Sequence, residues 1–228
     1  MTKVFIDGSS GTTGLRIRER LAARTDIELI TLTEELRKDD GARADALNSA
    51  DVAFLCLPDA AAVQAAAMTT SDKTVIIDTS TAHRVDPDWV YGFAELKGQR
   101  EKIAASKRIA NPGCHASGFI SLVAPLVQCG ILDKGEKLTC FSLTGYSGGG
   151  KKMIAEYEDP AKGRSLLAPR VYGLTMSHKH LPEMTKVCGL DTPPLFSPIV
   201  SFFYAGMEVS VPLYKEQIKG DIETVKAT

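Results

Sequence analysis

The sequence lacks an apolar run long enough to cross a membrane, and it lacks an excess of either charge. A membrane-spanning helix needs about 18 apolar residues in a row. The longest apolar stretches here are broken by Pro58 and Asp59 and by Ser121, Pro125 and Gln128. The 27 basic and 28 acidic residues leave a net charge of −1, which gives no field to attract nucleic acid or anionic lipid. The first residues hold no apolar segment typical of a secretory signal. We therefore expect no membrane partner and no nucleic-acid partner.

A framework of paired cysteines is also missing. The five cysteines are odd in number and lie mostly inside apolar runs. This usage is typical of a reducing compartment, so we expect a cytoplasmic protein in which any special cysteine is chemical rather than structural. The composition, 44% hydrophobic and 24% charged over 228 residues, excludes a disordered, collagenous or coiled-coil chain. It suits one large α/β domain or two small ones.

The first half of the chain alternates short apolar runs with helical patterns. The runs lie at residues 4–6, 27–32, 52–57 and 75–78, and helical patterns follow the first and the third of them. Continuous apolar strands that alternate with helices indicate a parallel sheet buried on both faces. The sequence therefore predicts an N-terminal α/β domain of the Rossmann type.

A glycine loop joins the first predicted strand to the first predicted helix. Gly8, Gly11 and Gly14 have the spacing G-x-x-G-x-x-G. Glycines at this place let the backbone turn tightly and approach a pyrophosphate bound at the helix N-terminus. The spacing differs from the commoner G-x-G-x-x-G, so the prediction of a dinucleotide site depends on the position of the loop between strand and helix.

The residues after the second predicted strand bear on which dinucleotide binds. Glu34 or Glu35 would hold a ribose hydroxyl and favour NAD, whereas Arg37 or Lys38 would accept a 2′-phosphate and favour NADP. Both kinds of residue are present, so the residues alone leave the choice open.

One cysteine has a setting that favours reactivity. Cys114 follows the strand predicted at 108–110 and the segment Asn111-Pro112-Gly113, and it opens a long apolar segment. A cysteine in the first turn of a helix lies at the positive end of the helix dipole, which lowers its pKa and favours the thiolate. Cys56 and Cys140 lie in predicted strands and read as small buried side chains. We therefore interpret Cys114 as a nucleophile.

Two of the four histidines lie close together in the segment S-H-K-H-L-P-E-M. His178 and His180 share one face if the chain is extended. Pro182 suits the first turn of a helix, and Glu183 can hydrogen-bond a histidine and fix its tautomer. Further metal ligands at suitable spacing are missing nearby, so the pair predicts a general acid/base group rather than a zinc site. His83 and His115 are interpreted as local hydrogen-bonding groups.

A second glycine-rich loop, G-Y-S-G-G-G-K at residues 145–151, follows a strand predicted at 138–143. It fits the opening of a nucleotide phosphate loop, but Lys152 stands where a serine or threonine must reach magnesium. We therefore interpret the loop as a cradle for a substrate phosphate. Arg84 is a second expected phosphate ligand, because a guanidinium group suits oxyanions.

These motifs occur together in one order along the chain. G-x-x-G-x-x-G, Y-G-x-x-E-L at 91–96, N-P-G-C, G-Y-S-G-G-G-K and H-x-H-x-P-E extend from Gly8 to Glu183. In this combination the chain resembles the N-acetyl-γ-glutamyl-phosphate reductase family of arginine biosynthesis. It is most similar to the shorter-chain branch, in which a histidine, here His115, follows the cysteine. Ser117 replaces the more usual threonine.

The resemblance implies two domains and a reaction. An NAD(P)-binding Rossmann domain would cover residues 1–113, and an α/β domain with a mixed sheet, for catalysis and oligomerisation, would cover 114–228. The implied reaction is the NADPH-dependent reduction of the acyl phosphate N-acetyl-γ-glutamyl phosphate to N-acetylglutamate semialdehyde and phosphate, through a thioester on the cysteine. The resemblance also implies a homo-oligomer, a dimer or a tetramer.

The same resemblance gives roles to particular residues. The expected catalytic residues are Cys114, His180, His178 and Glu183, with no metal. The expected NADP(H)-binding residues are Gly8, Ser10, Gly11, Thr12, Thr13, Gly14, Arg37, Lys38 and Pro58. The expected substrate-binding and phosphate-binding residues are Arg84, Asn111, Ser147, Gly148, Gly149 and Lys151. His180 is preferred over His178 as the acid/base group because Glu183 lies one helical turn further on, but both stay open.

Two alternatives and one departure remain. An aspartate-semialdehyde-type dehydrogenase shares the glycine loop and the cysteine, although the H-x-H-x-P-E segment argues against it. A phosphate-loop ATP-binding protein depends on residues 145–151 alone. Chains of the family continue past the end of this one, which stops soon after a strand predicted at 209–213. We therefore expect an incomplete C-terminus.

Overall fold

The computed structural model describes residues 1–9 and 11–228. The chain forms two compact units, Met1–Pro112 and Gly113–Thr228, which we call unit 1 and unit 2 and describe separately.

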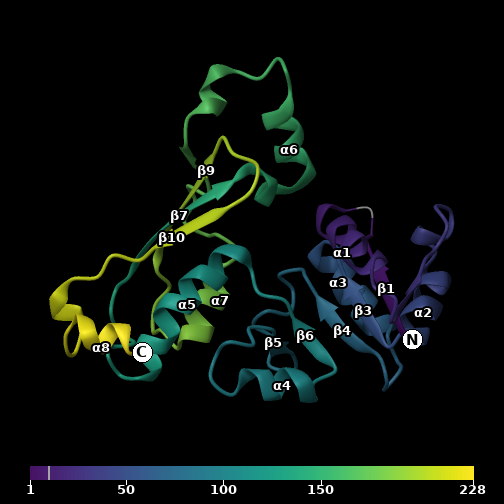
Figure 1. The fold of residues 1–228 in the computed structure, drawn as a ribbon, viewed down its shortest axis with the longest axis horizontal. Coiled ribbons are helices and arrows are strands. Elements are labelled where there is room, and N and C mark those ends of the chain that lie inside the picture. The colour runs from purple at the N-terminus through teal and green to yellow at the C-terminus, as the bar shows by residue number, and fades with distance from the viewer. Residues whose placement is uncertain (10) are drawn as a thin grey trace. The chain divides into compact units, whose positions relative to one another are not determined.

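Unit 1 contains a six-stranded sheet in the order β2-β1-β3-β4-β6-β5 (Figure 1). Every neighbouring pair in this sheet is parallel. The strands are β1 (Thr2–Asp7), β2 (Ile27–Ile30), β3 (Val52–Leu55), β4 (Val75–Asp78), β5 (Val90–Tyr91) and β6 (Arg108–Ala110). The helices are α1 (Thr12–Ala22), α2 (Asp40–Ser49), α3 (Asp59–Met68) and α4 (Gln99–Ala105), with a 3-10 turn η1 at Leu36–Lys38. The predicted Rossmann-type fold class is confirmed.

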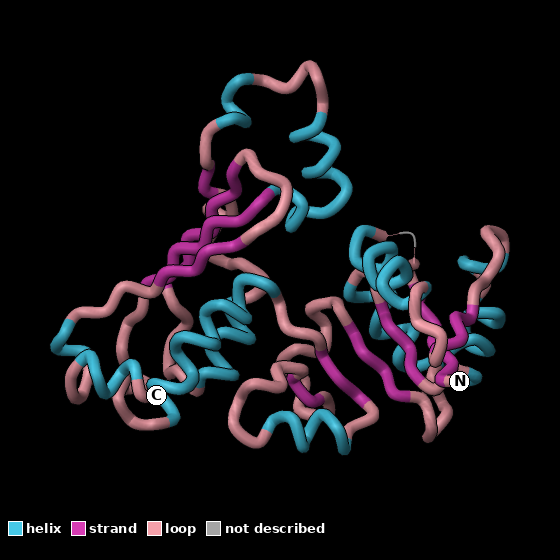
Figure 2. Tube along the Cα trace, viewed as in Figure 1, coloured by secondary structure: helices cyan, strands magenta, loops and turns pink. Residues whose placement is uncertain are grey.

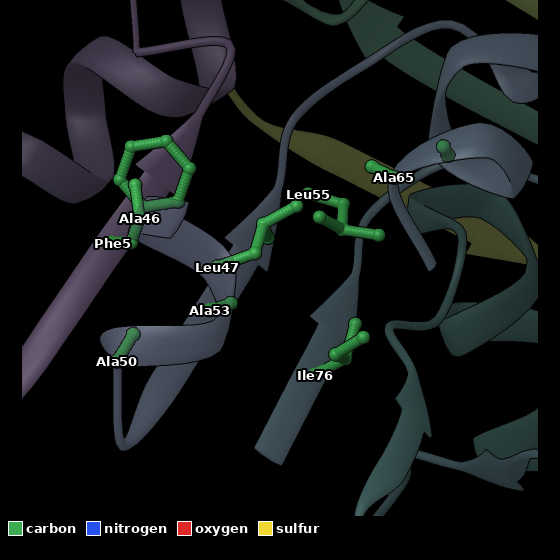
Figure 3. Packing of buried hydrophobic residues seen from close by; sticks show 9 residues of the cluster. Phe5, Ala46, Leu47, Ala50, Ala53, Leu55, Ala65 and Ile76 are labelled. Atoms are coloured by element: carbon green, nitrogen blue, oxygen red, sulfur yellow. The ribbon is translucent and has the colours of Figure 1, made fainter. Parts of the chain in front are cut away.

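The core of unit 1 lies between this sheet and the helices α2 and α3. Figure 3 shows Phe5, Leu55 and Ile76 from the strands packed beside Leu47 of α2. Alanines fill much of the α3 side, and the small side chains of Ala62 and Ala65, both fully buried, let this helix lie close to the strands. Each large apolar side chain buried in this way contributes about 1.5–3 kcal/mol of transfer free energy.

Two predicted strands are longer in the sequence pattern than in the structure. The second ends at Ile30 rather than at residue 32, and the third ends at Leu55 rather than at residue 57. Leu32 and Leu57 are apolar because they pack on the core from the loops that follow, outside the ladder. Apolarity therefore extended both predictions past the last hydrogen-bonded pair.

Unit 2 contains a four-stranded mixed sheet in the order β10-β7-β9-β8, drawn in magenta in Figure 2. The central pair, β7 with β9, is parallel, and both outer pairs are antiparallel. The strands are β7 (Thr139–Gly145), β8 (Arg170–Val171), β9 (Leu195–Ser201) and β10 (Met207–Ser210). The helices are α5 (Cys114–Gln128), α6 (Gly150–Glu158), α7 (Leu181–Cys188) and α8 (Ile222–Lys226), with 3-10 turns η2 (Tyr146–Gly149), η3 (Arg164–Leu167) and η4 (Lys215–Gln217).

One face of the unit 2 sheet is covered and the other carries exposed apolar side chains. Helix α5 packs against α7 and against β10 (Figure 1). The approach of α5 to β10 is so close that a Cβ at Gly118 would lie 2.4 Å from Cγ2 of Val209. On the opposite face, Phe141 and Leu195 stay 42% and 52% exposed.

None of the helices in the described part of the chain is long and apolar enough to span a membrane.

Candidate active site

The first glycine loop has the geometry that its glycines permit. Gly8 adopts a φ of +85°, and a Cβ on it would lie 2.3 Å from the carbonyl oxygen of Cys56. A Cβ on Gly14 would lie 2.4 Å from the carbonyl oxygen of Gly8. The N–H of Gly11 donates to the same carbonyl at 3.0 Å, and Gly11 is the N-cap of α1. Strand, tight turn and helix N-terminus therefore follow each other as a pyrophosphate site requires.

A cavity of about 730 Å³ lies beside this loop, within unit 1. Its wall includes Gly8, the end of β2, and four cationic side chains, Arg18, Arg37, Lys38 and Arg43. Arg37 forms an ion pair with Glu34, which also lines the cavity. Cations and a glycine turn on one wall fit a dinucleotide with a phosphate on its ribose. Arg18 was not among the predicted residues, because its position in the middle of α1 carries no motif.

A buried ion pair supports the same wall. Asp7, the last residue of β1, accepts from Nη2 of Arg43 at 2.9 Å, and both side chains are almost fully buried. Nη1 of Arg43 donates to Asp40 at 2.8 Å. Although burial works in the opposite direction, the hydrogen bonds and charges of these carboxylates raise the pKa of Arg43. Asp7 lies directly before the first glycine loop. Arg43 therefore neutralises a carboxylate whose charge would otherwise repel a phosphate bound there.

The remaining predicted cofactor residues take these positions. Ser10 lies outside the described residues. Thr12, Thr13 and Gly14 begin α1. Pro58 is the N-cap of α3, and its neighbour Leu57 lines the cavity, as does Ala61 one turn into α3.

Arg84 and Asn111 are brought together at the carboxyl ends of β4 and β6. Nε of Arg84 donates to the carbonyl oxygen of Asn111 at 3.0 Å, and Nη2 donates to that of Thr79 at 3.2 Å. The backbone N–H of Asn111 in turn donates to the carbonyl of Asp78 at 2.7 Å. Substrates of open parallel sheets bind at this edge, so the placement suits the predicted role.

The loop that carries Arg84 is held by a buried carboxylate. Asp78 accepts hydrogen bonds from the hydroxyl of Ser80 at 2.7 Å and interacts with Nδ1 of His83 at 2.6 Å. The His83 ring stacks on Trp89, with centroids 4.0 Å apart. His83 is thus a local hydrogen-bonding group, as its interpretation from the sequence had it.

Cys114 is the first residue of α5, and its side chain is exposed. The helix N-cap, Gly113, donates its N–H to Oε2 of Glu183 at 3.0 Å. Glu183 is buried in the first turn of α7 and comes within 4.0 Å of Nε2 of His180, an ion-pair distance longer than a hydrogen bond. One carboxylate therefore lies against both the turn that presents the cysteine and one of the two predicted histidines.

The other cysteines have different surroundings. Burial raises the pKa of Cys56 to about 11 and the pKa of Cys140 and of Cys188 to about 12, which keeps these thiols protonated. Cys129 is exposed but caps the C-terminus of α5, the negative end of the helix. Among the described residues no group of three or more His, Cys, Asp or Glu side chains is arranged to hold a metal.

Three histidines, rather than two, form a cluster in unit 2. The rings of His178 and His180 lie 4.7 Å apart, and the ring of His115 lies 5.7 Å and 5.5 Å from them. Phe196 of β9 contacts His115 and His178 with centroid distances of 5.3 Å and 5.0 Å. The interpretation of His115 as a local hydrogen-bonding group is incomplete, because its partners come from distant segments.

Hydrogen bonds distinguish the nitrogens of this cluster. The backbone N–H of His180 donates to Nδ1 of His178 at 3.2 Å, so Nδ1 of His178 acts as an acceptor and its neutral ring carries the proton on Nε2. Burial, with a smaller contribution from the charge of Lys179, lowers the pKa of His178. His178 therefore suits a hydrogen-bond donor better than a proton acceptor.

His115 is tied to two hydroxyl groups. Its Nδ1 lies 2.7 Å from Oγ of Ser142 on β7, and its Nε2 lies 2.7 Å from Oη of Tyr172. Burial, with a smaller contribution from the charge of His178, lowers the pKa of His115 to about 4, so this imidazole is neutral at ordinary pH. Ser142 and Tyr172 carry no motif, and sequence reasoning missed both.

The second glycine loop is more occupied than the phosphate-cradle hypothesis assumes. The N–H groups of Gly145, Tyr146 and Ser147 donate to the carbonyls of Gly206, Phe203 and Tyr204 at 3.0, 3.0 and 2.9 Å. The N–H of Gly150 is used within η2. The first amides of the loop therefore bind the connection between β9 and β10. These bonds remove the run of open amides that a nucleotide phosphate loop needs. Of the predicted cradle, Gly148 and Gly149 lie in η2, and Lys151 lies in the first turn of α6.

Comparison with protein families assigns both units to one class. Residues 3–106 match the family described as semialdehyde dehydrogenase, NAD binding domain, and residues 114–227 match semialdehyde dehydrogenase, dimerisation domain. The class that a Rossmann-type unit and a cysteine-histidine unit define here is therefore that of the semialdehyde dehydrogenases.

Curated relatives narrow the class. The chain is 52% identical over 219 residues to an N-acetyl-γ-glutamyl-phosphate reductase of Sinorhizobium medicae, and the match covers 95% of this chain and 71% of the relative. A protein of Brucella anthropi with the same description is 50% identical over 221 residues, and this match covers 96% of this chain and 71% of the relative. The chain belongs to the N-acetyl-γ-glutamyl-phosphate reductase family, as its motifs predicted.

Solved structures show the same fold at low sequence identity. The aspartate semialdehyde dehydrogenase from Francisella tularensis matches with a TM-score of 0.70 and 14% identity, covering all of this chain and 79% of that one. The enzyme from Candida albicans, solved with NADP, matches with a TM-score of 0.66 and 16% identity over all of this chain and 75% of that one.

Proposed function

We propose that this protein reduces N-acetyl-γ-glutamyl phosphate to N-acetylglutamate semialdehyde and phosphate, with NADPH as reductant and Cys114 as nucleophile. The family and its relatives support the reaction. The observation that carries the role of the cysteine is the placement of an exposed thiol at the start of α5, where Gly113 is fixed by the buried carboxylate of Glu183.

The chemistry proceeds in two stages on the sulfur of Cys114. The thiolate, favoured by the helix N-terminus, attacks the acyl carbon, and the carbon–oxygen bond to phosphate breaks to leave a thioester. NADPH, when bound, supplies the hydride for this carbon. The resulting alkoxide takes a proton from a histidine. The same histidine takes the proton back as the carbon–sulfur bond breaks and the aldehyde leaves.

The hydrogen-bond pattern favours His180 over His178 as this histidine. A proton carrier needs a nitrogen that gains and loses a proton, and the neutral ring of His178 already holds its Nε2 proton while Nδ1 accepts from the backbone. His180 lies beside the carboxylate of Glu183, which stabilises an imidazolium. His178 then serves as a donor to the substrate.

The described residues of unit 1 fit NADP(H). The tight turn at Gly8 and the helix N-terminus at Gly11 suit the pyrophosphate. Lys38 and Arg18, together with Arg37, line the adjacent cavity and suit a 2′-phosphate, whereas Glu34 is engaged by Arg37. Arg84 and Asn111 are proposed to bind the substrate phosphate, and Ser147, Gly148, Gly149 and Lys151 form a second proposed group of substrate-binding residues.

Assembly and location are part of the proposal. We infer a homo-oligomer, a dimer or a tetramer, because the outer face of the unit 2 sheet carries exposed Phe141, Leu195 and Val171. The register places Val171 opposite Ile199, and Leu195 opposite Thr139, on that one face. A cytoplasmic location follows from the reducing conditions that a reactive cysteine requires.

A single-turnover experiment in the reverse direction tests the role of Cys114. Semialdehyde and NADP⁺ mixed with enzyme in the absence of phosphate should give about one NADPH per active site and an acyl adduct on Cys114, because the thioester has no acceptor. Intact-mass and peptide mass spectrometry locate the adduct. Cys114→Ser should give neither NADPH nor adduct but should still bind NADPH. Reductase activity retained in this variant would contradict the mechanism.

A further inference from the structure

The buried chain Ser142–His115–Tyr172 has a direction that its surroundings determine. Ser142 lies on the covered face of β7 and is 0% exposed. Across residues 1–9 and 11–228, its Oγ has one hydrogen-bond partner, Nδ1 of His115, and Oη of Tyr172 likewise has one, Nε2 of the same ring. The direction of the two bonds therefore depends on which group must donate.

The hydroxyl group of Ser142 must donate its hydrogen bond to His115. A buried O–H without an acceptor costs about 1–3 kcal/mol, and Nδ1 of His115 is the acceptor at 2.7 Å. A neutral imidazole holds one proton, so the proton of His115 is on Nε2 and is donated to Oη of Tyr172. Tyr172 accepts this bond, and its own O–H is left to donate elsewhere.

The bond to His115 holds the Tyr172 hydroxyl at the helix turn that carries Cys114. Tyr172 is half-buried, and it is bonded to the residue that follows Cys114 in the first turn of α5. Burial, and to a smaller extent the charge of Cys114, raises the pKa of Tyr172 to about 12. Tyr172 therefore keeps its hydroxyl proton at every working pH and can act as a hydrogen-bond donor.

We propose that Tyr172 donates a hydrogen bond to an oxygen of the substrate acyl group carried by Cys114, and that Ser142 and His115 are positioning residues that aim this donor. The inference rests on the proposed function. His115 takes no part in proton transfer, because protonating it would break its bond from Ser142. It fixes the orientation of Tyr172 through its tautomer, while His180 remains the proton carrier.

The tautomer of His115 can be measured without any activity. In long-range ¹H–¹⁵N spectra of the histidine-labelled protein, His115 should show an unprotonated Nδ1 and a protonated Nε2, assigned by the loss of its signals in His115→Gln. Ser142→Ala removes the donor and should turn this pattern into the opposite tautomer or a mixture. A protonated Nδ1 in the wild-type protein would overturn the inference, whatever the enzyme catalyses.

Kinetics test the donor itself. Tyr172→Phe keeps the ring and should lower kcat/KM by about tenfold to a hundredfold, as expected for a hydrogen bond to an oxygen that gains charge. Ser142→Ala should lower it by a smaller factor, in step with the change of tautomer. Tyr214→Phe, at a tyrosine that is 79% exposed, is the matched control and should leave it unchanged.

The outcomes separate the two proposals. Wild-type turnover that Tyr172→Phe leaves unchanged would overturn the donor role and leave the proposed function standing. A wild-type protein without phosphate-dependent turnover would overturn the proposed function, and with it the substrate that Tyr172 is said to contact. A structural role alone would lower stability in Tyr172→Phe without the specific loss in kcat/KM.

Discussion

At the scale of single residues, the three clustered histidines of unit 2 differ in where each holds a proton. His115 is neutral between two hydroxyls, His178 accepts from a backbone amide, and His180 faces a carboxylate. All three residues are histidines, so the differences in their proposed roles come from their surroundings. The assignment makes separate predictions for each ring.

We expect His180→Asn to lower kcat by about 10²–10⁴-fold, because the proton carrier is lost. The limb of the pH profile that belongs to the acid/base group should disappear with it. His178→Asn is the matched change, and it should mainly raise KM while keeping that limb. Steady-state kinetics over a pH series decides between them. Loss of the limb in His178→Asn alone would reverse the assignment.

The buried neutral ring of His115 also makes stability depend on pH. An ordinary histidine takes up its proton near pH 6.5, whereas His115 does so near pH 4 in the folded protein. Between these values the unfolded chain binds more protons, so the free energy of unfolding falls as the pH falls. This group alone accounts for a loss of about 2 kcal/mol between about pH 7.5 and pH 5.

Urea unfolding measures that loss. His115→Gln should be less stable than wild type at pH 7.5 because it loses the bonds of the ring. From there to pH 5, however, its unfolding free energy should fall by about 2 kcal/mol less than that of wild type. Equal slopes in the two proteins would mean that His115 is not held neutral.

Residues with a local motif were predictable at this scale, and residues that meet across the chain were not. Cys114 and Glu183 belong to short motifs whose chemistry depends on neighbours in sequence. Ser142 and Tyr172 are 27 and 57 positions away from His115, and only the sheet and the loop before α7 bring them to it. Their role depends on tertiary structure, which a motif cannot carry.

At the scale of elements, the turn from β1 into α1 depends on two glycines for different reasons. Gly8 needs its positive φ as well as space beside the carbonyl of Cys56. Gly14 needs space alone, because a Cβ there would meet the carbonyl oxygen of Gly8 at 2.4 Å. At Gly11 the corresponding distance is 3.3 Å. The loop should therefore tolerate a methyl group at Gly11 but not at Gly14.

Gly14→Ala should lower the free energy of unfolding by about 1–3 kcal/mol, the usual cost of overpacking, despite the better helix propensity of alanine. Gly11→Ala should change it by much less. Chemical denaturation without cofactor keeps the comparison free of contacts to the dinucleotide. Equal effects of the two substitutions would show that the turn relaxes and that close packing does not fix it.

Elements with a strong apolar pattern were predicted, and polar or interrupted ones were missed. Strands β1, β3 and β4 are short apolar runs, and β7 was expected within two residues of its bounds. Helix α2, with the sequence DGARADALNS, has too few apolar residues for a clear period, although Asp39 caps it by accepting from the N–H of Ala42 at 2.7 Å. Strand β9 contains Pro198 and was not recognised, because proline argues against a strand inside a sheet.

At the scale of the whole molecule, the proposed oligomer assigns an interface to the outer face of the unit 2 sheet. Phe141 lies on it at 42% exposure, beside Leu143 on the same strand face. Several exposed apolar side chains on one sheet face are typical of an interface between subunits. The matched family of residues 114–227 is also described as a dimerisation domain.

Phe141→Glu should therefore shift the protein from an oligomer toward the monomer in light scattering coupled to size exclusion. A charge buried in the interface would be unpaired, which costs several kcal/mol. Ile222→Glu, at an apolar side chain on α8 that is 63% exposed, should leave the mass unchanged. If the wild-type protein is a monomer, or if both variants dissociate alike, this face is not the interface.

The central claim is that the chain makes and breaks an acyl phosphate, and the reverse reaction tests it most directly. Purified protein is mixed with N-acetylglutamate semialdehyde and NADP⁺, with and without inorganic phosphate, and NADPH is followed by its absorbance. We predict continuous NADPH formation that requires phosphate and does not occur with aspartate semialdehyde. Sustained turnover without phosphate, or a preference for aspartate semialdehyde, would contradict the account.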